Sequence, residues 1–218
     1  MNIFVVTEGR GDKYLYKSWI PYVNPNITYV DCIVNITDNN FSIVHSFGNP
    51  YYFRTIDKAI EDVNDHGNID RLVISVDSEE LSLQDKQSEI RRYLASKSCS
   101  ASKFVIIQHF CIETWALGNK RACPVNPNSQ ALLTFKNLFD VRILDPELLP
   151  PYPPRKLNRA QFAEVYLRSM LQDRNMHLSY NKSRPKPLRR LAYFNQIRLR
   201  YQNTNHIASF NSFLNAFV

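Results

Sequence analysis

The sequence has 218 residues, no long apolar run and few cysteines, and each of these deficits excludes a class of protein. No apolar run exceeds about five residues, whereas a helix that crosses a bilayer needs about 20. The N-terminus shows no basic stretch followed by a long apolar segment, so we expect no signal peptide, no membrane association and a cytoplasmic location. The four cysteines form no C-x-x-C pair, which argues against zinc and favours reduced thiols.

Acidic residues are scarce in the last third of the chain. Residues 151–218 hold 12 Lys and Arg but 2 Asp and Glu, a net charge of +10. Residues 1–150 hold 15 basic and 18 acidic residues, a net charge of −3, and the two parts sum to +7. Because clustered basic side chains attract phosphate backbones, the C-terminal part is predicted to bind nucleic acid. A solvated basic surface is the alternative.

Strands and helices alternate along the first two thirds of the chain. Apolar runs predict buried strands at residues 3–7, 71–76 and 103–110, and a short strand at 141–144. Residues 27–36 and 41–47 alternate in the β manner, as a hairpin or as one strand with an insertion. Helical patterns lie between these strands. The sequence therefore predicts an α/β fold with a mostly parallel, Rossmann-like sheet flanked by helices.

A proline-rich segment then interrupts this pattern, with five prolines in residues 146–154. Proline excludes regular helix and strand, so this segment is the best boundary in the chain. We predict a catalytic domain at 1–145, a linker at 146–157 and a basic helical subdomain at 158–218. Helical spacing in the subdomain is clearest at 158–175 and 189–202.

Carboxylates follow three of the predicted buried strands. Glu8 precedes a glycine turn, Asp77 and Glu79 follow the next strong strand, and Glu113 follows the third. In extended backbone, residues two apart project to the same side, so Asp77 and Glu79 would point together. Clustered carboxylates need a cation between them, and hard oxygen ligands suit Mg²⁺ or Mn²⁺. Exposed, unrelated acidic residues are the alternative.

These motifs resemble the TOPRIM domain. "VVTEGRGDKYLY" is similar to its opening strand and Glu-Gly turn, and "LVISVDSEE" to its strand followed by Asp-x-Asp. Within the superfamily, "CIETWALGN" and "YNKSRP" resemble segments of the OLD (overcoming lysogenization defect) nucleases and their small stand-alone relatives. The resemblance implies that Glu8, Asp77 and Glu113 are metal ligands, with Glu8 as ligand or general base. Glu79 stands where the family has its second aspartate, and we expect it to serve as the fourth catalytic metal ligand in its place.

The resemblance implies a Mg²⁺-dependent or Mn²⁺-dependent endonuclease that hydrolyses DNA or RNA. A basic side chain would neutralise the transition state, and we favour Lys182 over Lys120. Arg184, Lys186, Arg189 and Arg190 would bind the nucleic-acid backbone. Such nucleases often act with an ATPase in defence against phage, and this chain has no G-x-x-x-x-G-K-[ST] loop, so the ATPase would be a separate protein. The alternative is a non-catalytic TOPRIM-like scaffold that docks on the ATPase or on nucleic acid.

Overall fold

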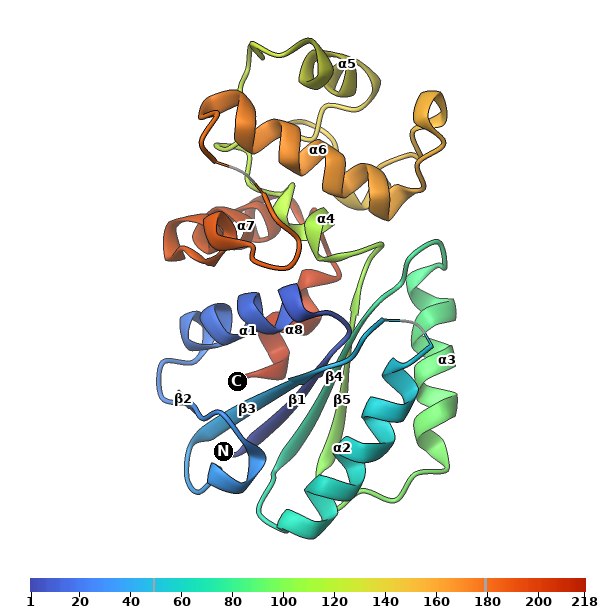
Figure 1. Cartoon of the computed structure of the whole chain (residues 1–218), viewed down its shortest axis with the longest axis vertical. Helices are drawn as coiled ribbons and strands as arrows, with labels where there is room; N and C mark the ends of the chain where they lie inside the picture. Colours follow the sequence, from blue (N-terminus) through green and yellow to red (C-terminus); the bar gives the residue numbers. More distant parts are fainter. Residues whose placement is uncertain (49, 179) are drawn as a thin grey trace. The chain divides into compact units, whose positions relative to one another are not determined.

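The structure is a computed structural model that describes residues 1–48, 50–178 and 180–218 (Figure 1). The described residues form two compact units, which we name the sheet unit and the helical unit. The sheet unit comprises Met1–Val76, Leu83–Ile107 and Ser212–Val218. The helical unit comprises Asp77–Ser82 and Gln108–Asn211, so the proline-rich segment lies inside it.

The sheet has five parallel strands in the order β2-β3-β1-β4-β5, which confirms the predicted α/β class and the parallel sheet. The strands are β1 (Ile3–Thr7), β2 (Thr28–Tyr29), β3 (Asn40–His45), β4 (Arg71–Asp77) and β5 (Ser102–Gln108). Strand β1 is central, and Val5 pairs with Ile43 on one side and Val73 on the other. All five residues of β1 are buried, as expected for a parallel strand that is covered on both faces.

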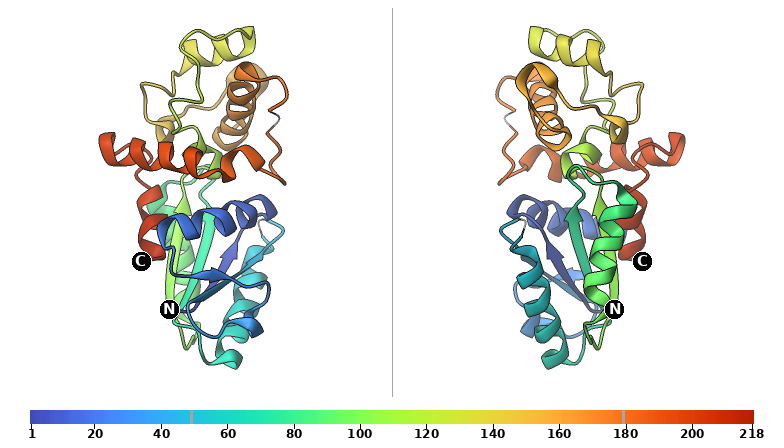
Figure 2. Two further views of the ribbon diagram at one scale, coloured as in Figure 1. Left: turned by 90° about the vertical axis from the view of Figure 1, so that its left-hand side faces the viewer. Right: turned by 90° about the vertical axis from the view of Figure 1, so that its right-hand side faces the viewer.

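Helices cover both faces of this sheet (Figure 2). Helices α2 (Tyr52–His66) and α3 (Leu83–Ala95) lie on one face, where their apolar side chains form one core with β1 and β4. Helix α1 (Arg10–Val23) covers the other face. There Tyr16 shares a 2.6 Å hydrogen bond with Ser75 and meets the ring of Phe213 edge-on at 4.9 Å. Buried aromatic residues of this kind supply much of the apolar area of the core.

Two of the predicted strand features are wrong. Residues 27–36 form no hairpin with the next strand, because β2 is two residues long and pairs with β3 in parallel. Most of this segment is irregular, with a short 3₁₀ helix at Ile33–Asn35. The strand predicted at 141–144 is a turn. The carbonyl of Asp140 accepts the amides of Ile143 and Leu144, and its carboxylate accepts the amide of Arg142 at 2.9 Å.

The helical unit is built from the predicted helices. They are α4 (Ile112–Ala116), α5 (Gln130–Leu138), α6 (Arg159–Arg174), α7 (Leu191–Thr204) and the start of α8 (Phe210–Ala216). Short 3₁₀ helices lie at Pro146–Leu148, Pro153–Arg155 and Lys186–Arg189. Among the helices that the structure describes, none is both long and apolar enough to cross a bilayer.

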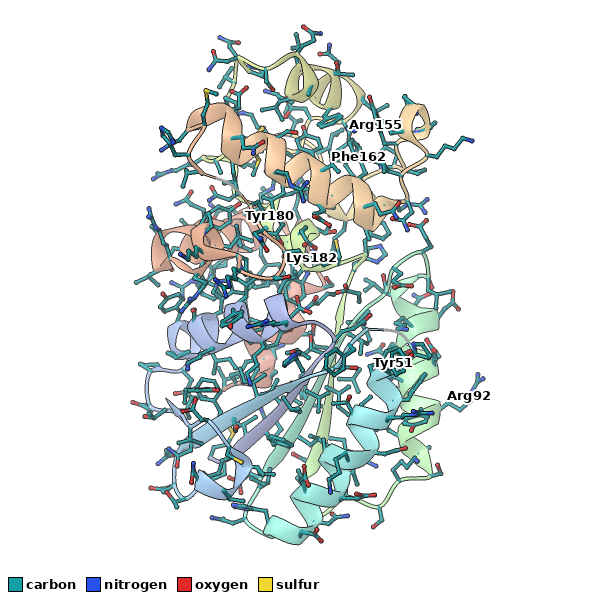
Figure 3. The ribbon with its side chains drawn as sticks, in the orientation of Figure 1. Tyr51, Arg92, Arg155, Phe162, Tyr180 and Lys182 are labelled. Carbon is teal, nitrogen blue, oxygen red and sulfur yellow. The ribbon has the colours of Figure 1, made fainter. Side chains whose placement is uncertain are left out.

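An aromatic cluster holds α5, α6 and the proline-rich segment together. Phe162 of α6, labelled in Figure 3, stacks on Tyr152 with ring centroids 4.9 Å apart. Phe135 of α5 meets Phe162 edge-on at 5.2 Å. The helix begins at a capping box, in which Asn158 accepts the amide of Gln161 and Gln161 accepts the amide of Asn158.

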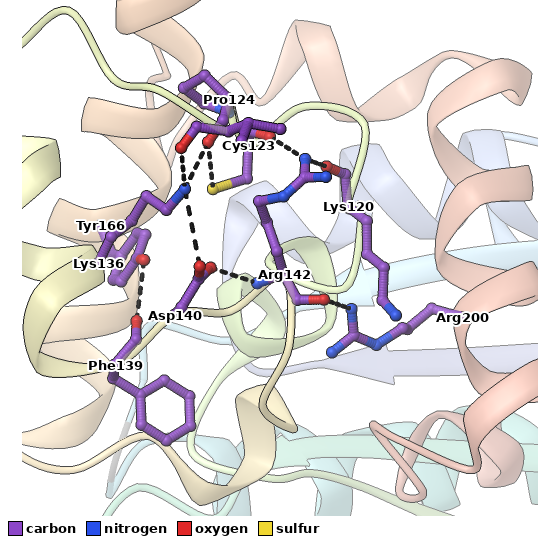
Figure 4. A network of polar contacts seen from close by, with 10 residues as sticks. Lys120, Cys123, Pro124, Lys136, Phe139, Asp140, Arg142, Tyr166 and Arg200 are labelled. Carbon is purple, nitrogen blue, oxygen red and sulfur yellow. Dashed lines mark hydrogen bonds and ion pairs between the residues drawn. The ribbon is translucent and has the colours of Figure 1, made fainter.

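Two arginines, of which Arg200 is buried and Arg142 half-buried, brace the loops of the helical unit through backbone carbonyls (Figure 4). Arg142 Nη1 donates to the carbonyls of Lys120 at 3.0 Å and Cys123 at 2.7 Å. Arg200 in turn donates to the carbonyls of Arg142 and Leu144. Burial lowers the pKa of Arg200 to about 10. Part of the positive charge of this chain therefore stabilises loops and is not displayed to solvent.

Candidate functional site

Glu8 lies at the carboxyl end of the central strand, where ligands bind in open parallel sheets. It directly follows Thr7, which pairs with Ser75 of β4, and its exposed fraction is 8%. Gly9 after it has φ −123°, an extended conformation that any residue can adopt. The turn that follows Glu8 therefore does not use the extra backbone freedom that a glycine in a turn suggests. The requirement is one of space. A Cβ on Gly9 would lie 3.1 Å from Oδ2 of Asp12, the side chain that accepts the Gly9 amide.

Asp77 and Glu79 belong to the helical unit and differ in their surroundings. Asp77 is the last residue of β4 and is half-buried, whereas Glu79 is exposed. The expectation of extended backbone from Asp77 to Glu79 is wrong, because Glu79 has φ +51°. Its amide donates to the carbonyl of Phe110, another non-glycine residue with positive φ, at 3.0 Å. Two left-handed residues, Glu79 and Phe110, thus meet in one turn. The alternation of an extended strand, which would point Asp77 and Glu79 to the same side, does not continue to Glu79.

Glu113 is the most unusual of the four carboxylates. It lies in the first turn of α4, shortly after β5 ends, and is fully buried. Tyr180 donates a 2.6 Å hydrogen bond to its Oε1. Its Oε2 is also buried and has no hydrogen-bond partner among the residues that the structure describes. A buried polar oxygen without a partner is costly, so Oε2 of Glu113 is a candidate ligand atom.

Three of the predicted residues act on one buried thiol, that of Cys111. Burial raises the pKa of this thiol well above its usual range, and the negative charges of Glu113 and Asp77 raise it further. The positive charge of Lys182 acts in the opposite direction. Asp77, Glu113 and Lys182 of the helical unit therefore lie within electrostatic reach of Cys111, and we name these four residues the Cys111 cluster. Figure 3 labels Tyr180 and Lys182 on the same segment.

The ligand atoms of this cluster are of the type that a hard divalent cation prefers, but they are few. Carboxylate oxygens are the ligands of Mg²⁺ and Mn²⁺, and Oε2 of Glu113 is free to accept one. Within residues 1–48, 50–178 and 180–218, however, no three His, Cys, Asp or Glu side chains are grouped closely enough to hold a metal ion. Asp77 and Glu113 are the two carboxylates that the helical unit offers near Cys111.

Tyr180 and Tyr193 lie next to the basic residues along the chain, and packing in the helical subdomain is the interpretation that the sequence favours over base stacking. The structure confirms the packing interpretation. Both are buried, with Tyr180 bonded to Glu113 and Tyr193 donating to the carbonyl of Ala116 at 2.9 Å. The contact of Tyr180 with the candidate-site residue Glu113 is one that sequence reasoning missed, and the place of Tyr180 two residues before Lys182 was its only signal.

The four predicted nucleic-acid-binding residues lie on the segment that leads into α7. Arg184, Lys186, Arg189 and Arg190 are all exposed. Arg184, Lys186 and Arg190 pair with no side chain among the described residues, whereas Arg159 nearer the candidate site pairs with Glu80 at 2.6 Å. Their role in binding nucleic acid stays a prediction.

Comparison of the chain with protein-family models, with curated proteins and with solved structures finds no match. The resemblance to the TOPRIM superfamily therefore depends on the motifs themselves. The fold class and the buried Glu113 cluster are the structural observations on which a functional proposal can be built.

Proposed function

We propose that this protein is a metal-dependent nuclease of the TOPRIM superfamily that hydrolyses phosphodiester bonds. The observation that carries the proposal is the buried carboxylate of Glu113, with one oxygen held by Tyr180 and the other without a partner among the described residues. A protein gains nothing in stability from such a group, so its cost indicates a functional use.

Each residue of the cluster has a distinct role in this proposal. Asp77 and Glu113 would hold Mg²⁺ or Mn²⁺. Glu8 would be a third ligand, a role that is proposed on the sequence motif alone. Such an ion, when bound, lowers the pKa of water and neutralises charge on the phosphate. Tyr180 orients the Glu113 carboxylate through its 2.6 Å hydrogen bond. Lys182 supplies positive charge against the negative charge that develops on the phosphate.

The basic segment would hold the substrate by its backbone. Arg184, Lys186 and Arg189 provide phosphate contacts without reading bases, so we expect little sequence preference. Binding is then expected to weaken steeply with salt. The resemblance to OLD nucleases adds the proposal of a separate ATPase partner and of a role in defence against phage.

A non-catalytic scaffold is the second candidate. It is favoured by the absence, among the described residues, of a group of three metal-ligating side chains, and by the exposed, left-handed Glu79 in place of a second aspartate. A scaffold of this kind would bind nucleic acid or an ATPase through its basic segment and would show no turnover.

Cleavage assays separate the two candidates. Supercoiled plasmid, linear duplex and RNA are each incubated with Mg²⁺ or Mn²⁺ and with wild type, Glu113→Gln or Glu164→Gln. Glu164 is a matched control, since its carboxylate pairs with Arg168 on α6 and lies outside the Cys111 cluster. We expect metal-dependent cutting that Glu113→Gln loses and Glu164→Gln keeps. Equal cutting by all three proteins, or salt-sensitive binding without cutting, would reject the nuclease.

A further inference from the structure

A cleft in the helical unit has the features of an anion-binding site. It encloses about 520 Å³, within the usual range of small-molecule sites. Its polar lining consists of two arginines, three carboxamides and a tyrosine, and no acidic residue lines it. These residues are Asn119, Arg121, Arg190, Tyr193, Asn195 and Gln196; the remaining lining is aliphatic.

Asn119 holds one wall of the cleft in place. Its side chain is buried, with an exposed fraction of 5%. Its Oδ1 accepts the amides of Arg121 and Ala122, at 3.1 and 3.2 Å, and thereby holds the turn after α4. Asn119 also lines the cleft, so its side-chain amide can donate to a ligand oxygen.

Positive charge converges on the same cleft. The guanidinium groups of Arg121 and Arg190 pair with no described side chain, so their charge is open to a ligand. Arg190 is also the N-cap of α7, a 14-residue helix whose N-terminus has no side-chain cap. Ala192, in the first turn of this helix, lines the cleft. Two arginines and a helix N-terminus together favour a phosphate group.

We propose that this cleft binds a nucleoside phosphate, with the phosphate between Arg121 and Arg190 and the base against the carboxamides. Carboxamides both donate and accept, as the edges of bases do, and the aliphatic lining suits the faces of a base. The volume suits one free mononucleotide better than a strand. This proposal is independent of the nuclease proposal, because the cleft shares no residue with the Cys111 cluster.

Helix α4 connects the cleft to the candidate site. Tyr193 lines the cleft, and its hydroxyl donates to the carbonyl of Ala116 in α4, three residues after Glu113. A nucleotide that packs on Tyr193 therefore contacts a side chain that is tied to the helix of the buried carboxylate. Binding in the cleft is expected to stabilise α4.

Calorimetric titration of the full chain tests the proposal with seven probes: AMP, GMP, CMP, UMP, adenosine, inorganic phosphate and a single-stranded tetranucleotide. We expect AMP to bind at least about tenfold more tightly than phosphate or adenosine, since each of these lacks half of the contacts. Binding of the tetranucleotide alone would reject a free nucleotide and assign the cleft to the path of a strand. Absence of binding by GMP, CMP and UMP as well as AMP would overturn the proposal.

Variants locate the binding. Arg121→Gln is expected to weaken AMP binding about tenfold or more, because it removes one charge-assisted contact. Asn119→Asp keeps the oxygen that holds the turn and replaces the donor with a negative charge, so it is expected to abolish binding. Arg155→Gln is the matched control, an exposed arginine of the same unit that does not line the cleft (Figure 3). Equal affinity of Arg121→Gln and Arg155→Gln, both folded by thermal melting, would place the ligand elsewhere.

Discussion

Glu147 is expected to make the stability of this protein depend on pH, and the variant Glu147→Gln isolates the effect. Glu147 is buried in the helical unit, with an exposed fraction of 7%, and it accepts hydrogen bonds from the amide and the hydroxyl of Ser209. Ser209 also accepts the indole N–H of Trp115 at 2.7 Å. Burial raises the pKa of Glu147 from 4.5 to about 7, against the opposing hydrogen bonds from Ser209.

The sign follows from which state binds the proton more strongly. Between about pH 4.5 and pH 7, the folded protein holds a proton on Glu147 that the unfolded chain has lost. The free energy of unfolding therefore falls as pH rises through this window, and the full penalty is present above the folded pKa. A shift of this size corresponds to roughly 3 kcal/mol. The Gln side chain does not ionise and so incurs no such penalty. Glu147→Gln should therefore gain stability relative to wild type at high pH.

Urea denaturation at pH 5 and pH 8 measures the effect. The difference in unfolding free energy between Glu147→Gln and wild type should grow by roughly 2–3 kcal/mol from pH 5 to pH 8. Taking this difference cancels the titration of the five histidines. Glu164→Gln, at the ion pair with Arg168 on α6, controls for the substitution itself. A Glu147→Gln difference that is constant with pH would refute the reasoning and show that this carboxylate ionises normally in the fold.

Three further substitutions test single contacts by urea denaturation at pH 7. Tyr180→Phe removes the hydroxyl that donates to Oε1 of Glu113 and is expected to cost about 1–3 kcal/mol; an unchanged midpoint would show that the hydrogen bond does not form. Gly9→Ala places a methyl group 3.1 Å from Oδ2 of Asp12, which must release the Gly9 amide, at a cost of about 0.5–2 kcal/mol, and wild-type stability would contradict this. Arg200→Met removes two hydrogen bonds to carbonyls and is expected to destabilise by about 1–3 kcal/mol, whereas a stabilised variant would show that its burial outweighs them.

The fold was predictable where one physical signal dominates. The strands predicted at residues 3–7 and 71–76 are dominated by Ile, Val, Leu and Phe, and such stretches suit strands that are covered on both faces. Helix α6 was predictable from its length and spacing. The strand expected at 141–144 failed because the local hydrogen bonds of Asp140 closed a turn around side chains that look β-like in isolation.

The candidate site was predictable in its residue types and less so in its geometry. That Glu113 follows the third buried strand could be read from the sequence. Its hydrogen bond to Tyr180, 67 positions away, could not, because that contact depends on how the segment after α6 folds back. The left-handed turn at Glu79 was equally hidden, since a glutamate gives no local signal for positive φ.

The positive charge of the C-terminal part also needed the structure for its interpretation. Arg200 donates to loop carbonyls, and Arg159 forms an ion pair with Glu80. Arg184 and Lys186 remain exposed. Net charge therefore overstates the number of side chains that can meet a phosphate backbone, and the basic segment before α7 carries that prediction.

The central claim is that the buried carboxylate of Glu113 serves a divalent cation. Titration of the protein with Mn²⁺, with free Mn²⁺ counted by its electron paramagnetic resonance signal, tests it most directly. We predict saturable binding by wild type and by Glu164→Gln, and its loss in Glu113→Gln. Identical binding curves for all three proteins would contradict the account and exclude Glu113 as a ligand of the cation.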